Sequence, residues 1–287
     1  SLIGDRLTRV LGIVNGTTNY VLTRMTEEGL DFDDVLAEAQ RLGFAEADPT
    51  ADIDGHDAAA KAAILATIAF GTTVVAGDVH TEGIRQITAD LIERATRLGY
   101  VIKLLAIVER APGPDGADQV AVRVHPAMVP DSHPLANVRD SFNAVFVQGE
   151  AVDDLMFYGR GAGGGPTATA VLGDVIDAAQ NLIRGTHSDL GNLVPATIRP
   201  MAELRGGYYL DIEVLDRPGV LHAVAGVLAD HHVSVRMMEQ IDVPAGARLV
   251  FITHTVSESD VQAMRRELAS LDVVVDAGRL VRVIDGE

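Results

Sequence analysis

The chain has 287 residues, of which 47% are hydrophobic and 4% aromatic, which is enough for one large domain or two ordinary domains with real cores. Its 41 acidic residues outnumber its 23 basic residues, so nucleic acid and anionic membranes are disfavoured as partners, and no apolar run reaches the ~20 residues of a membrane-spanning helix. The absence of cysteine excludes disulfides, thiol catalysis and cysteine-ligated zinc, and it fits a cytoplasmic protein.

The N-terminal segment predicts a strand that turns directly into a helix. Residues 6–14 are mostly apolar and indicate the strand, Asn15-Gly16 is a turn signal, and Thr17 or Thr18 is expected to cap the helix. Open backbone N–H groups at such a helix start can bind an anionic group. An ordinary capped turn explains the same residues equally well, so Gly16 and Thr17 are candidate ligand contacts and no more at this point.

The run FAEADPTADIDGHDAAAK, residues 44–61, concentrates carboxylates just before a predicted helix. The alanine-rich segment that follows contains no helix breaker, and Asp54 or Gly55 is the expected N-cap. Asp57 and Lys61 are four residues apart and therefore share one face of that helix. An exposed ion pair worth a few tenths of a kcal/mol explains this spacing as well as a site does. The small apolar neighbours of Lys61 favour the site, because partial burial would promote the neutral amine that proton transfer requires.

Two patterns look like metal sites only superficially. An EF-hand frame over the acidic run places Lys61 where calcium needs a bidentate glutamate, so calcium is excluded. His125 and His133 each precede a proline, and no third nitrogen ligand lies close to them in the sequence. We interpret both as loop histidines, and we predict no metal site.

The middle of the chain predicts a regular alternation of elements. Lys103 interrupts one buried strand, and we expect its amine to reach solvent at the strand's end. A loop rich in Pro and Gly, residues 111–118, joins this strand to the next. The expected elements are helices over 33–42 and 90–98 and strands over 100–108, 120–125, 142–149 and 154–158.

The run GIVNGTTNYVLTRM, residues 12–25, followed by the acidic run over 44–61, resembles the catalytic domain of homoserine dehydrogenases. The resemblance extends over nearly the whole chain, with several separate motifs in the family's order. It implies NAD- or NADP-dependent interconversion of L-homoserine and L-aspartate 4-semialdehyde, a step of threonine and methionine biosynthesis. It also implies that family members carry a nucleotide-binding domain, with a second lysine near the substrate, ahead of this part.

The same resemblance implies roles for individual residues. Lys61 would accept the hydroxyl proton as the hydride leaves for the nicotinamide, and Asp57 would orient the substrate's polar end. The ammonium group of the amino acid would pair with carboxylates of the acidic run. The residues assigned to substrate binding are Glu46, Asp52, Gly16 and Thr17.

A glycine-rich loop precedes the next predicted helix, in the run YGRGAGGGPTATAVLGDVIDAAQNLI over residues 158–183. Glycines at a helix start let the backbone approach a phosphate closely, but this is neither a Walker loop nor a good Rossmann fingerprint. Taken by itself the loop is weak evidence for a ligand. In the family that the chain resembles it faces the dinucleotide, which makes Gly161, Gly163 and Gly164 expected contacts to NADP or NAD.

The C-terminal part changes pattern after an irregular segment over 185–206. The order of predicted elements is βαββαβ, which is a ferredoxin-like unit. With its DRPGVL turn this unit resembles an ACT domain, a module that senses amino acids and commonly pairs with copies of itself. The resemblance implies threonine regulation and a homodimer or homotetramer. The residues implied for the regulatory ligand are Asp216, Pro218, Gly219, Val220 and Leu221.

These observations predict an α/β (α+β) protein: a mixed-sheet substrate-binding domain followed by a ferredoxin-like βαββαβ ACT domain. The expected divisions are a catalytic and dimerisation domain over 1–184, a linker over 185–206 and the ACT domain over 207–287. Because no nucleotide-binding βαβ unit with GxGxxG is present, we expect a fragment that binds NAD or NADP poorly and does not turn over homoserine by itself.

Two other classes of protein fit parts of the sequence. A non-enzymatic ACT regulatory protein, with an amino-acid sensor attached to an inert α/β domain, explains the missing cofactor domain equally well. The acidic cluster argues against it, because an inert scaffold has no need for carboxylates and a lysine converging on one cleft. A divalent-metal hydrolase that uses the same carboxylates is a weaker alternative, which metal titration would test.

Overall fold

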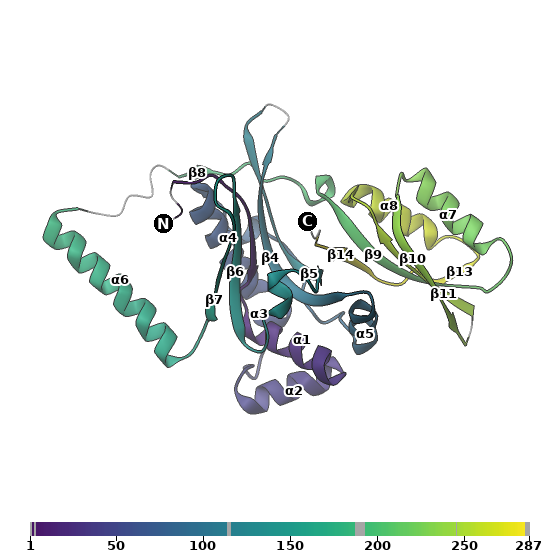
Figure 1. The fold of residues 1–287 in the computed structure, drawn as a ribbon, viewed down its shortest axis with the longest axis horizontal. Coiled ribbons are helices and arrows are strands. Elements are labelled where there is room, and N and C mark those ends of the chain that lie inside the picture. Colours follow the sequence, from purple (N-terminus) through teal and green to yellow (C-terminus); the bar gives the residue numbers. More distant parts are fainter. Residues whose placement is uncertain (1, 3, 114–115, 187–192, 245, 285–287) are drawn as a thin grey trace. The chain divides into compact units, whose positions relative to one another are not determined.

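The computed structural model describes residues 2, 4–113, 116–186, 193–244 and 246–284. The chain divides into two compact units, one of residues 1–126 and 131–198 and one of residues 127–130 and 199–287 (Figure 1). Parts of the predicted loop over 111–118, of the predicted linker over 185–206 and of the predicted C-terminal domain lie outside the described residues. The mixed α/β architecture predicted from the sequence is confirmed in both units.

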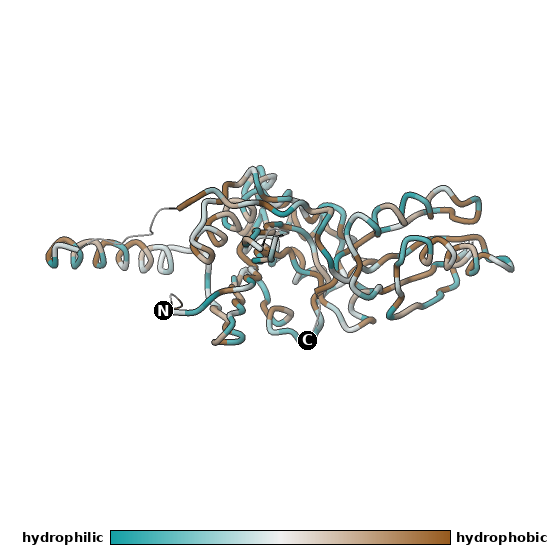
Figure 2. Tube along the Cα trace, turned by 90° about the horizontal axis from the view of Figure 1, so that it is seen from above, coloured by the Kyte–Doolittle hydropathy of each residue, from teal (hydrophilic) through white to brown (hydrophobic). Residues whose placement is uncertain are grey.

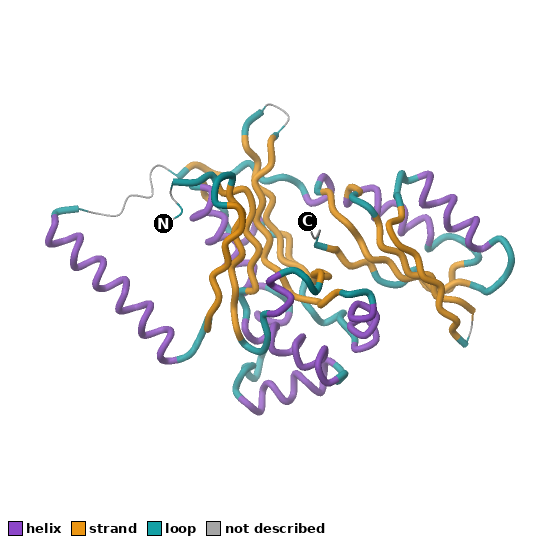
Figure 3. Tube along the Cα trace, viewed as in Figure 1, coloured by secondary structure: helices purple, strands orange, loops and turns teal. Residues whose placement is uncertain are grey.

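The first unit is built on a sheet with the strand order β5–β4–β1–β6–β7. β1 pairs antiparallel with both β4 and β6, and β6 pairs antiparallel with β7. Figure 3 shows the strands of the two units and the helices around them. Most residues of β4 are buried, which matches its nearly continuous apolar run. The strands are β1 (Leu7–Ile13), β4 (Tyr100–Pro112), β5 (Asp118–Pro130), β6 (Phe142–Gly149) and β7 (Asp153–Arg160).

Helices pack against this sheet and carry the acidic run. α1 contacts β4 and β6, whereas α4 contacts β4 and β1. Five alanines of α4 are buried, and their small size lets the helix approach the sheet closely. They are Ala58, Ala59, Ala62, Ala63 and Ala66. These helices are α1 (Gly16–Glu28), α2 (Phe32–Leu42), α3 (Thr50–Ile53), α4 (His56–Phe70) and α5 (Ala89–Arg97). Short elements are β2 (Thr72–Thr73), η1 (Ala76–Asp78), β3 (His80–Thr81), η2 (Pro134–Asn137) and β8 (Val194–Pro195).

Two residues of this unit differ from their sequence-based interpretation. Lys103 is 2% exposed and does not reach solvent, because its amine finds oxygen acceptors inside the protein. His125 is not a loop residue but a buried residue of β5, since that strand continues through Pro126 to Pro130. His133 does lie in a loop, where its Nδ1 accepts a hydrogen bond from the backbone N–H of Leu135.

α6 (Gly164–Arg184) follows the glycine-rich loop and has no buried residue. Its apolar side chains, among them Val171, Leu172, Val175 and Ile176, are more than half exposed. Hydrophobic and hydrophilic residues alternate along the helix (Figure 2). A helix with an apolar stripe normally buries it, so the stability of α6 does not come from packing within the described residues.

The second unit has the predicted ferredoxin-like order, with β10–β11–β9–β14 as neighbouring strands. The end of β5 belongs to this unit and pairs parallel with β14. α7 and α8 pack against each other. The elements are η3 (Met201–Glu203), β9 (Arg205–Val214), α7 (Val220–Asp230), β10 (Val235–Val243), β11 (Gly246–Thr253), β12 (Val256–Ser257), α8 (Glu258–Leu268), β13 (Val274–Asp276) and β14 (Leu280–Val283).

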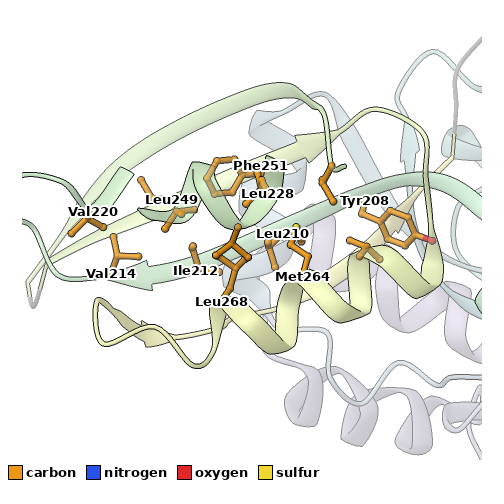
Figure 4. Close-up of a cluster of buried hydrophobic side chains, with 14 of the residues drawn as sticks. Tyr208, Leu210, Ile212, Val214, Val220, Leu228, Leu249, Phe251, Met264 and Leu268 are labelled. Atoms are coloured by element: carbon orange, nitrogen blue, oxygen red, sulfur yellow. The ribbon is translucent and has the colours of Figure 1, made fainter. Parts of the chain in front are cut away.

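Alternate residues of β9 form the centre of this unit's core. Leu210, Ile212 and Val214 are at most 2% exposed, and they pack with residues of β11 and both helices (Figure 4). Each such side chain contributes roughly 1.5–3 kcal/mol by leaving water. The alternation predicted for the strand from its sequence is therefore the alternation that builds the core.

Glu258, at the start of α8, is a buried carboxylate of this unit. It accepts hydrogen bonds from the Tyr208 hydroxyl at 2.8 Å and from the Arg282 guanidinium at 2.8 and 2.9 Å. Burial raises the pKa of Glu258, but these hydrogen bonds and the Arg282 charge outweigh burial and leave the pKa lower than usual. The ion pair is satisfied on both sides, which a buried charge requires.

The sequence predicts the last strand of the βαββαβ unit as one element over 273–284, and this prediction is wrong. The structure breaks it into β13 and β14, both of which pair with β9. Gly278 lies between them with a left-handed φ of 57°, and the Asp211 carboxylate accepts from the Arg279 N–H at 2.7 Å. The break arises because this side-chain acceptor holds the backbone out of the regular ladder.

Candidate functional site

The turn after β1 is organised by Asn15, which caps α1. Its Oδ1 accepts a hydrogen bond from the Thr18 N–H at 2.9 Å, so the cap is Asn15 and not Thr17 or Thr18 as the sequence predicted. The Asn15 side chain is 5% exposed, and its Nδ2 donates outward to two carboxylates. One amide therefore fixes the start of α1 and the acidic run together.

The acidic run contributes Asp52, Asp57 and Lys61 to one cluster. Asn15 Nδ2 donates to Asp52 Oδ1 at 2.7 Å and to Asp57 Oδ2 at 2.9 Å. Lys61 Nζ donates to the same Asp57 oxygen at 2.7 Å and to the Val14 carbonyl at 3.0 Å. Each carboxylate thus keeps lone pairs free for a ligand, and the amine keeps one N–H.

Lys61 is more exposed than its alanine-rich surroundings indicate. Its side chain is 45% exposed and that of Asp57 is 34% exposed. The reason is positional, because Ala60 and Ile64 are exposed too, so this side of α4 is not covered within the described residues. The predicted convergence of Asp57 and Lys61 is nevertheless observed, and it occurs at the wall of a cavity.

This cavity has a volume of about 470 Å³ and is lined on one side by Asp52, Asp57 and Lys61. The start of α1 supplies Asn15, Gly16 and Thr17 to its lining. Gly16 packs so tightly that a Cβ there would lie 2.9 Å from the Ser141 carbonyl oxygen. A larger cavity of about 720 Å³, beside Leu65 and Phe157, is lined mostly by apolar side chains and holds no comparable polar cluster.

Residues from β6, β7 and the glycine-rich loop form a second part of the lining. They include Asn143, Arg160, Gly161 and Gly163. A Cβ on Gly161 would lie 1.9 Å from Asn143 Nδ2, so this position requires glycine. The loop therefore brings backbone against the cavity without a side chain in between, as a phosphate-binding loop must.

A buried network holds the segment before β6 in place beside the cavity. Lys103 Nζ donates to Asn19 Oδ1 at 3.0 Å and to the Val138 carbonyl at 2.6 Å. Asn19 Nδ2 in turn donates to the Asp140 carbonyl at 2.9 Å and to the Phe142 carbonyl at 3.1 Å. Asp140 has a left-handed φ of 52°, which is unfavourable for a residue other than glycine and is held by these bonds.

Burial affects the protonation of this network. Burial, followed by the charge of Arg139, lowers the pKa of Lys103 to about 8, against opposing contributions from Glu27 and Asp140. The charged and neutral forms of the Lys103 amine therefore balance near pH 8.

Most of the residues assigned from the sequence meet in this cavity, but two do not line it. Glu46 is exposed in the loop before α3, and its backbone carbonyl accepts from Gln40 Nε2. Gly164 begins α6, one residue beyond the glycines that line the wall. The residues that do line the cavity are Gly16, Thr17, Asp52, Asp57, Lys61, Gly161 and Gly163.

Sequence reasoning missed Asn15, Ser141, Asn143 and Arg160. Asn15 carried a signal, since an asparagine directly before a helical pattern is a strong N-cap candidate. The other three lie 80, 82 and 99 residues after Lys61, the last residue of the acidic run. Only the pairing of β1 with β6 brings them close, and no local pattern announces that pairing.

The DRPGVL turn lies in the second unit, immediately before α7. Gly219 is the N-cap residue with a left-handed φ of 92°, which explains the glycine. Val220 is buried, whereas Asp216, Pro218 and Leu221 are exposed. The turn thus presents polar backbone and one carboxylate to solvent at a helix start.

Comparison with known proteins gives one family match for the N-terminal part of the chain and another for the C-terminal part. Residues 1–176 match the family described as homoserine dehydrogenase, and residues 208–273 match the ACT domain. The homoserine dehydrogenase of Corynebacterium glutamicum is 49% identical over 287 residues, covering 99% of this chain and 64% of that protein. This chain belongs to the homoserine dehydrogenase family. Its length is thus about two thirds that of such relatives.

Other homoserine dehydrogenases agree with this membership. That of Bacillus subtilis is 41% identical, over 98% of this chain and 65% of its own length. The crystal structure of a homoserine dehydrogenase from Thiobacillus denitrificans has a TM-score of 0.92 at 40% identity, over 99% of this chain and 65% of that one. A hyperthermophilic archaeal homoserine dehydrogenase mutant, solved in complex with NADPH, has a TM-score of 0.52 at 31% identity, over 63% of this chain and 50% of that one.

Two further structural findings bear on this homoserine dehydrogenase chain. Among the described residues, no helix combines the length and the apolarity that crossing a bilayer demands. In the same part of the chain, no three His, Asp or Glu side chains are grouped closely enough to hold a metal ion.

Proposed function

We propose that this chain forms the substrate-binding and regulatory parts of a homoserine dehydrogenase, which interconverts L-homoserine and L-aspartate 4-semialdehyde with NAD or NADP. The observation that carries the proposal is the cluster at the cavity wall. Asn15 Nδ2 joins Asp52 to Asp57, and Lys61 Nζ lies 2.7 Å from the shared Asp57 oxygen. A small molecule with both an ammonium group and a hydroxyl matches a wall that offers carboxylates beside an amine.

In the oxidation direction, Lys61 acts as the base that accepts the hydroxyl proton. This requires its neutral form, and Asp57 and the Val14 carbonyl hold the amine in position for the transfer. Asp52 pairs with the ammonium group of the amino acid. The open N–H groups of Gly16 and Thr17 at the start of α1 bind its carboxylate. Glu46, from the preceding loop, is proposed as a further contact to the ammonium group.

The cavity residues from β6, β7 and the glycine-rich loop fit a dinucleotide. When bound, the dinucleotide supplies the hydride acceptor for the oxidation. Gly161 and Gly163 put backbone against the cavity, and Asn143 Oδ1 is buried there without a hydrogen-bond donor in the described part of the chain. We propose Gly161, Gly163 and Gly164 as cofactor contacts on this basis.

Replacing the proposed base tests the function directly. In the full-length gene product, Lys61→Ala should lower kcat for homoserine oxidation by about 10²–10⁴-fold, since that is the usual contribution of a general base. Spectroscopic assay of NADPH formation measures this. Lys103→Ala is not a suitable control because Lys103 is buried. Arg184→Gln, an exposed change at the end of α6, should leave kcat unaltered. Near-normal turnover by Lys61→Ala would contradict the assignment.

We extend the proposal to the organisation of the protein. The proposed divisions are the catalytic domain over 1–184, the linker over 185–206 and the ACT domain over 207–287. The ACT domain is proposed to bind threonine at its DRPGVL turn and to support a homodimer or homotetramer. We also propose a cytoplasmic location, which a cysteine-free chain with amino-acid substrates fits. An ACT sensor without enzymatic activity is the competing function, and the Lys61→Ala experiment separates the two.

A further inference from the structure

Arg160 is the last residue of β7 and lies on an aromatic platform. Its guanidinium carbon is 4.7 Å from the centre of the Phe142 ring, the cross-strand partner of Arg160. Phe142 is itself stacked on Tyr158, with ring centres 5.0 Å apart and planes inclined by 12°. A cation over an aromatic face is held in one place while its N–H groups stay free to donate.

Arg160 has no ion-pair partner in the described ranges of the chain. No carboxylate oxygen of those residues lies within 4.0 Å of its nitrogens, although the chain carries 41 acidic residues. The other cation of the cavity, Lys61, is paired with Asp57. Arg160 therefore offers the cavity an uncompensated positive charge.

A second polar group beside Arg160 also lacks a partner. Asn143 Oδ1 is buried and accepts no hydrogen bond from the residues that the structure describes. Asn143 and Arg160 both line the cavity, and Asn143 lies against Gly161, the residue after Arg160. A buried acceptor without a donor costs about 1–3 kcal/mol, which a bound ligand removes. The two groups thus point independently to a ligand at this wall.

We propose that Arg160 is a cofactor-positioning residue that binds the diphosphate of the dinucleotide, with Asn143 accepting a hydrogen bond from the same ligand. The inference rests on the proposed function, which places a dinucleotide here. The guanidinium group of Arg160 can donate two parallel hydrogen bonds to phosphate oxygens. Arg160 also directly precedes the glycines whose backbone lines the cavity. The carboxylate of the amino acid is the other anion in the reaction, but the proposed function already assigns it to the N–H donors at the start of α1.

The test uses the full-length gene product and measures binding as well as turnover. Fluorescence titration with NADPH and with NADH gives the Kd of each, and steady-state assays give KM for cofactor and for homoserine. Arg160→Gln should raise the Kd of both cofactors by about 10- to 100-fold, the value of a charge-assisted hydrogen bond. Homoserine KM should stay within about twofold. Arg160→Lys keeps the charge but cannot donate two parallel hydrogen bonds, and its affinity for both cofactors should fall about 3- to 10-fold.

Salt dependence and a matched variant complete the design. Wild-type affinity for NADPH should fall with added salt more steeply than that of Arg160→Gln, because the variant has lost one charged contact. Arg184→Gln removes an exposed arginine outside the cavity and should bind both cofactors as wild type does. Phe142→Leu removes the platform and should weaken cofactor binding less than Arg160→Gln.

Three results would overturn the inference. The first is an unchanged Kd of both cofactors in Arg160→Gln. The second is a loss of affinity for NADPH but not for NADH, which would exclude the diphosphate that both cofactors share. The third is a rise in the KM for homoserine instead of a rise in the Kd of the cofactors. Failure of the proposed function would look different, since wild-type protein would then bind cofactor without oxidising homoserine. The two titrations require no turnover, so each conclusion can fail separately.

Discussion

At the scale of single residues, Lys103 couples the stability of the fold to pH. Its amine is buried and holds the segment that contains Asp140, and burial lowers its pKa to about 8 from 10.5. Between these two pH values the unfolded chain binds a proton that the folded chain does not. Folding stability contributed by this group therefore rises with pH across that window and is lowest below it.

Lys103→Met removes this pH dependence. We expect the free energy of unfolding of wild type, relative to the variant, to increase by about 3 kcal/mol between pH 7.5 and pH 10.5. The hydrogen bonds lost in the variant weigh equally at each pH and cancel from the slope. Urea unfolding followed by circular dichroism at several pH values measures the difference. Parallel stability curves for the two proteins would show that the amine keeps its ordinary pKa.

Individual site residues were predictable only where a local pattern marked them. Asp57 and Lys61 are four apart on one helix, and their contact follows from helix geometry alone. Asn15 was visible as a turn residue, but its two carboxylate partners lie 37 and 42 residues away. Burial of Lys103 was mispredicted, because the acceptors that make it tolerable come from α1 and from the loop before β6.

At the scale of elements, Gly83 fixes the position of the end of α3. Gly83 lies against the end of this helix, where a Cβ would be 2.2 Å from the Ile53 carbonyl oxygen and 2.6 Å from Asp54 Cα. The neighbouring Ile84 N–H donates to the same carbonyl at 2.9 Å. α3 carries Asp52, so the contact sets the position of a proposed substrate ligand.

Gly83→Ala should displace α3, because backbone atoms cannot rotate away as a flexible side chain can. We expect kcat/KM of the full-length protein for homoserine to fall about 10- to 100-fold and the free energy of unfolding to fall by about 1–3 kcal/mol. Gly77→Ala is the matched control, since nothing lies within 4 Å of a Cβ at Gly77. Wild-type kinetics in Gly83→Ala would mean that α3 does not set the geometry of Asp52.

Long, strongly patterned elements were predictable from the sequence, and short ones were not. The alanine-rich helix α4, the apolar strand β4 and the order of elements in the second unit follow from periodicity. α3 has four residues and leaves no periodic trace. The break between β13 and β14 depends on Asp211, 67 residues before Gly278, so a continuous strand was the natural expectation.

At the scale of the whole molecule, the proposed chemistry and the proposed regulation belong to different units. The cavity residues lie in the first unit, and the DRPGVL turn lies in the second. The second unit has its own hydrophobic core and a satisfied buried ion pair. A ligand of the second unit should therefore bind even where the proposed reaction cannot occur.

Calorimetry of the 287-residue chain tests this separation. Threonine should give a binding signal, whereas NADPH should bind weakly and homoserine should not be oxidised, because the chain spans only 64% of its Corynebacterium glutamicum relative. Asp216→Ala, in the exposed turn, should weaken threonine binding about tenfold through loss of a charged hydrogen bond. Asp272→Ala changes an equally exposed aspartate of the same unit and should leave the affinity unaltered. If threonine gives no heat, or if Asp216→Ala and Asp272→Ala bind threonine equally well, the turn is not the regulatory site. Measurable homoserine turnover by this chain would show that the first unit needs no further cofactor domain.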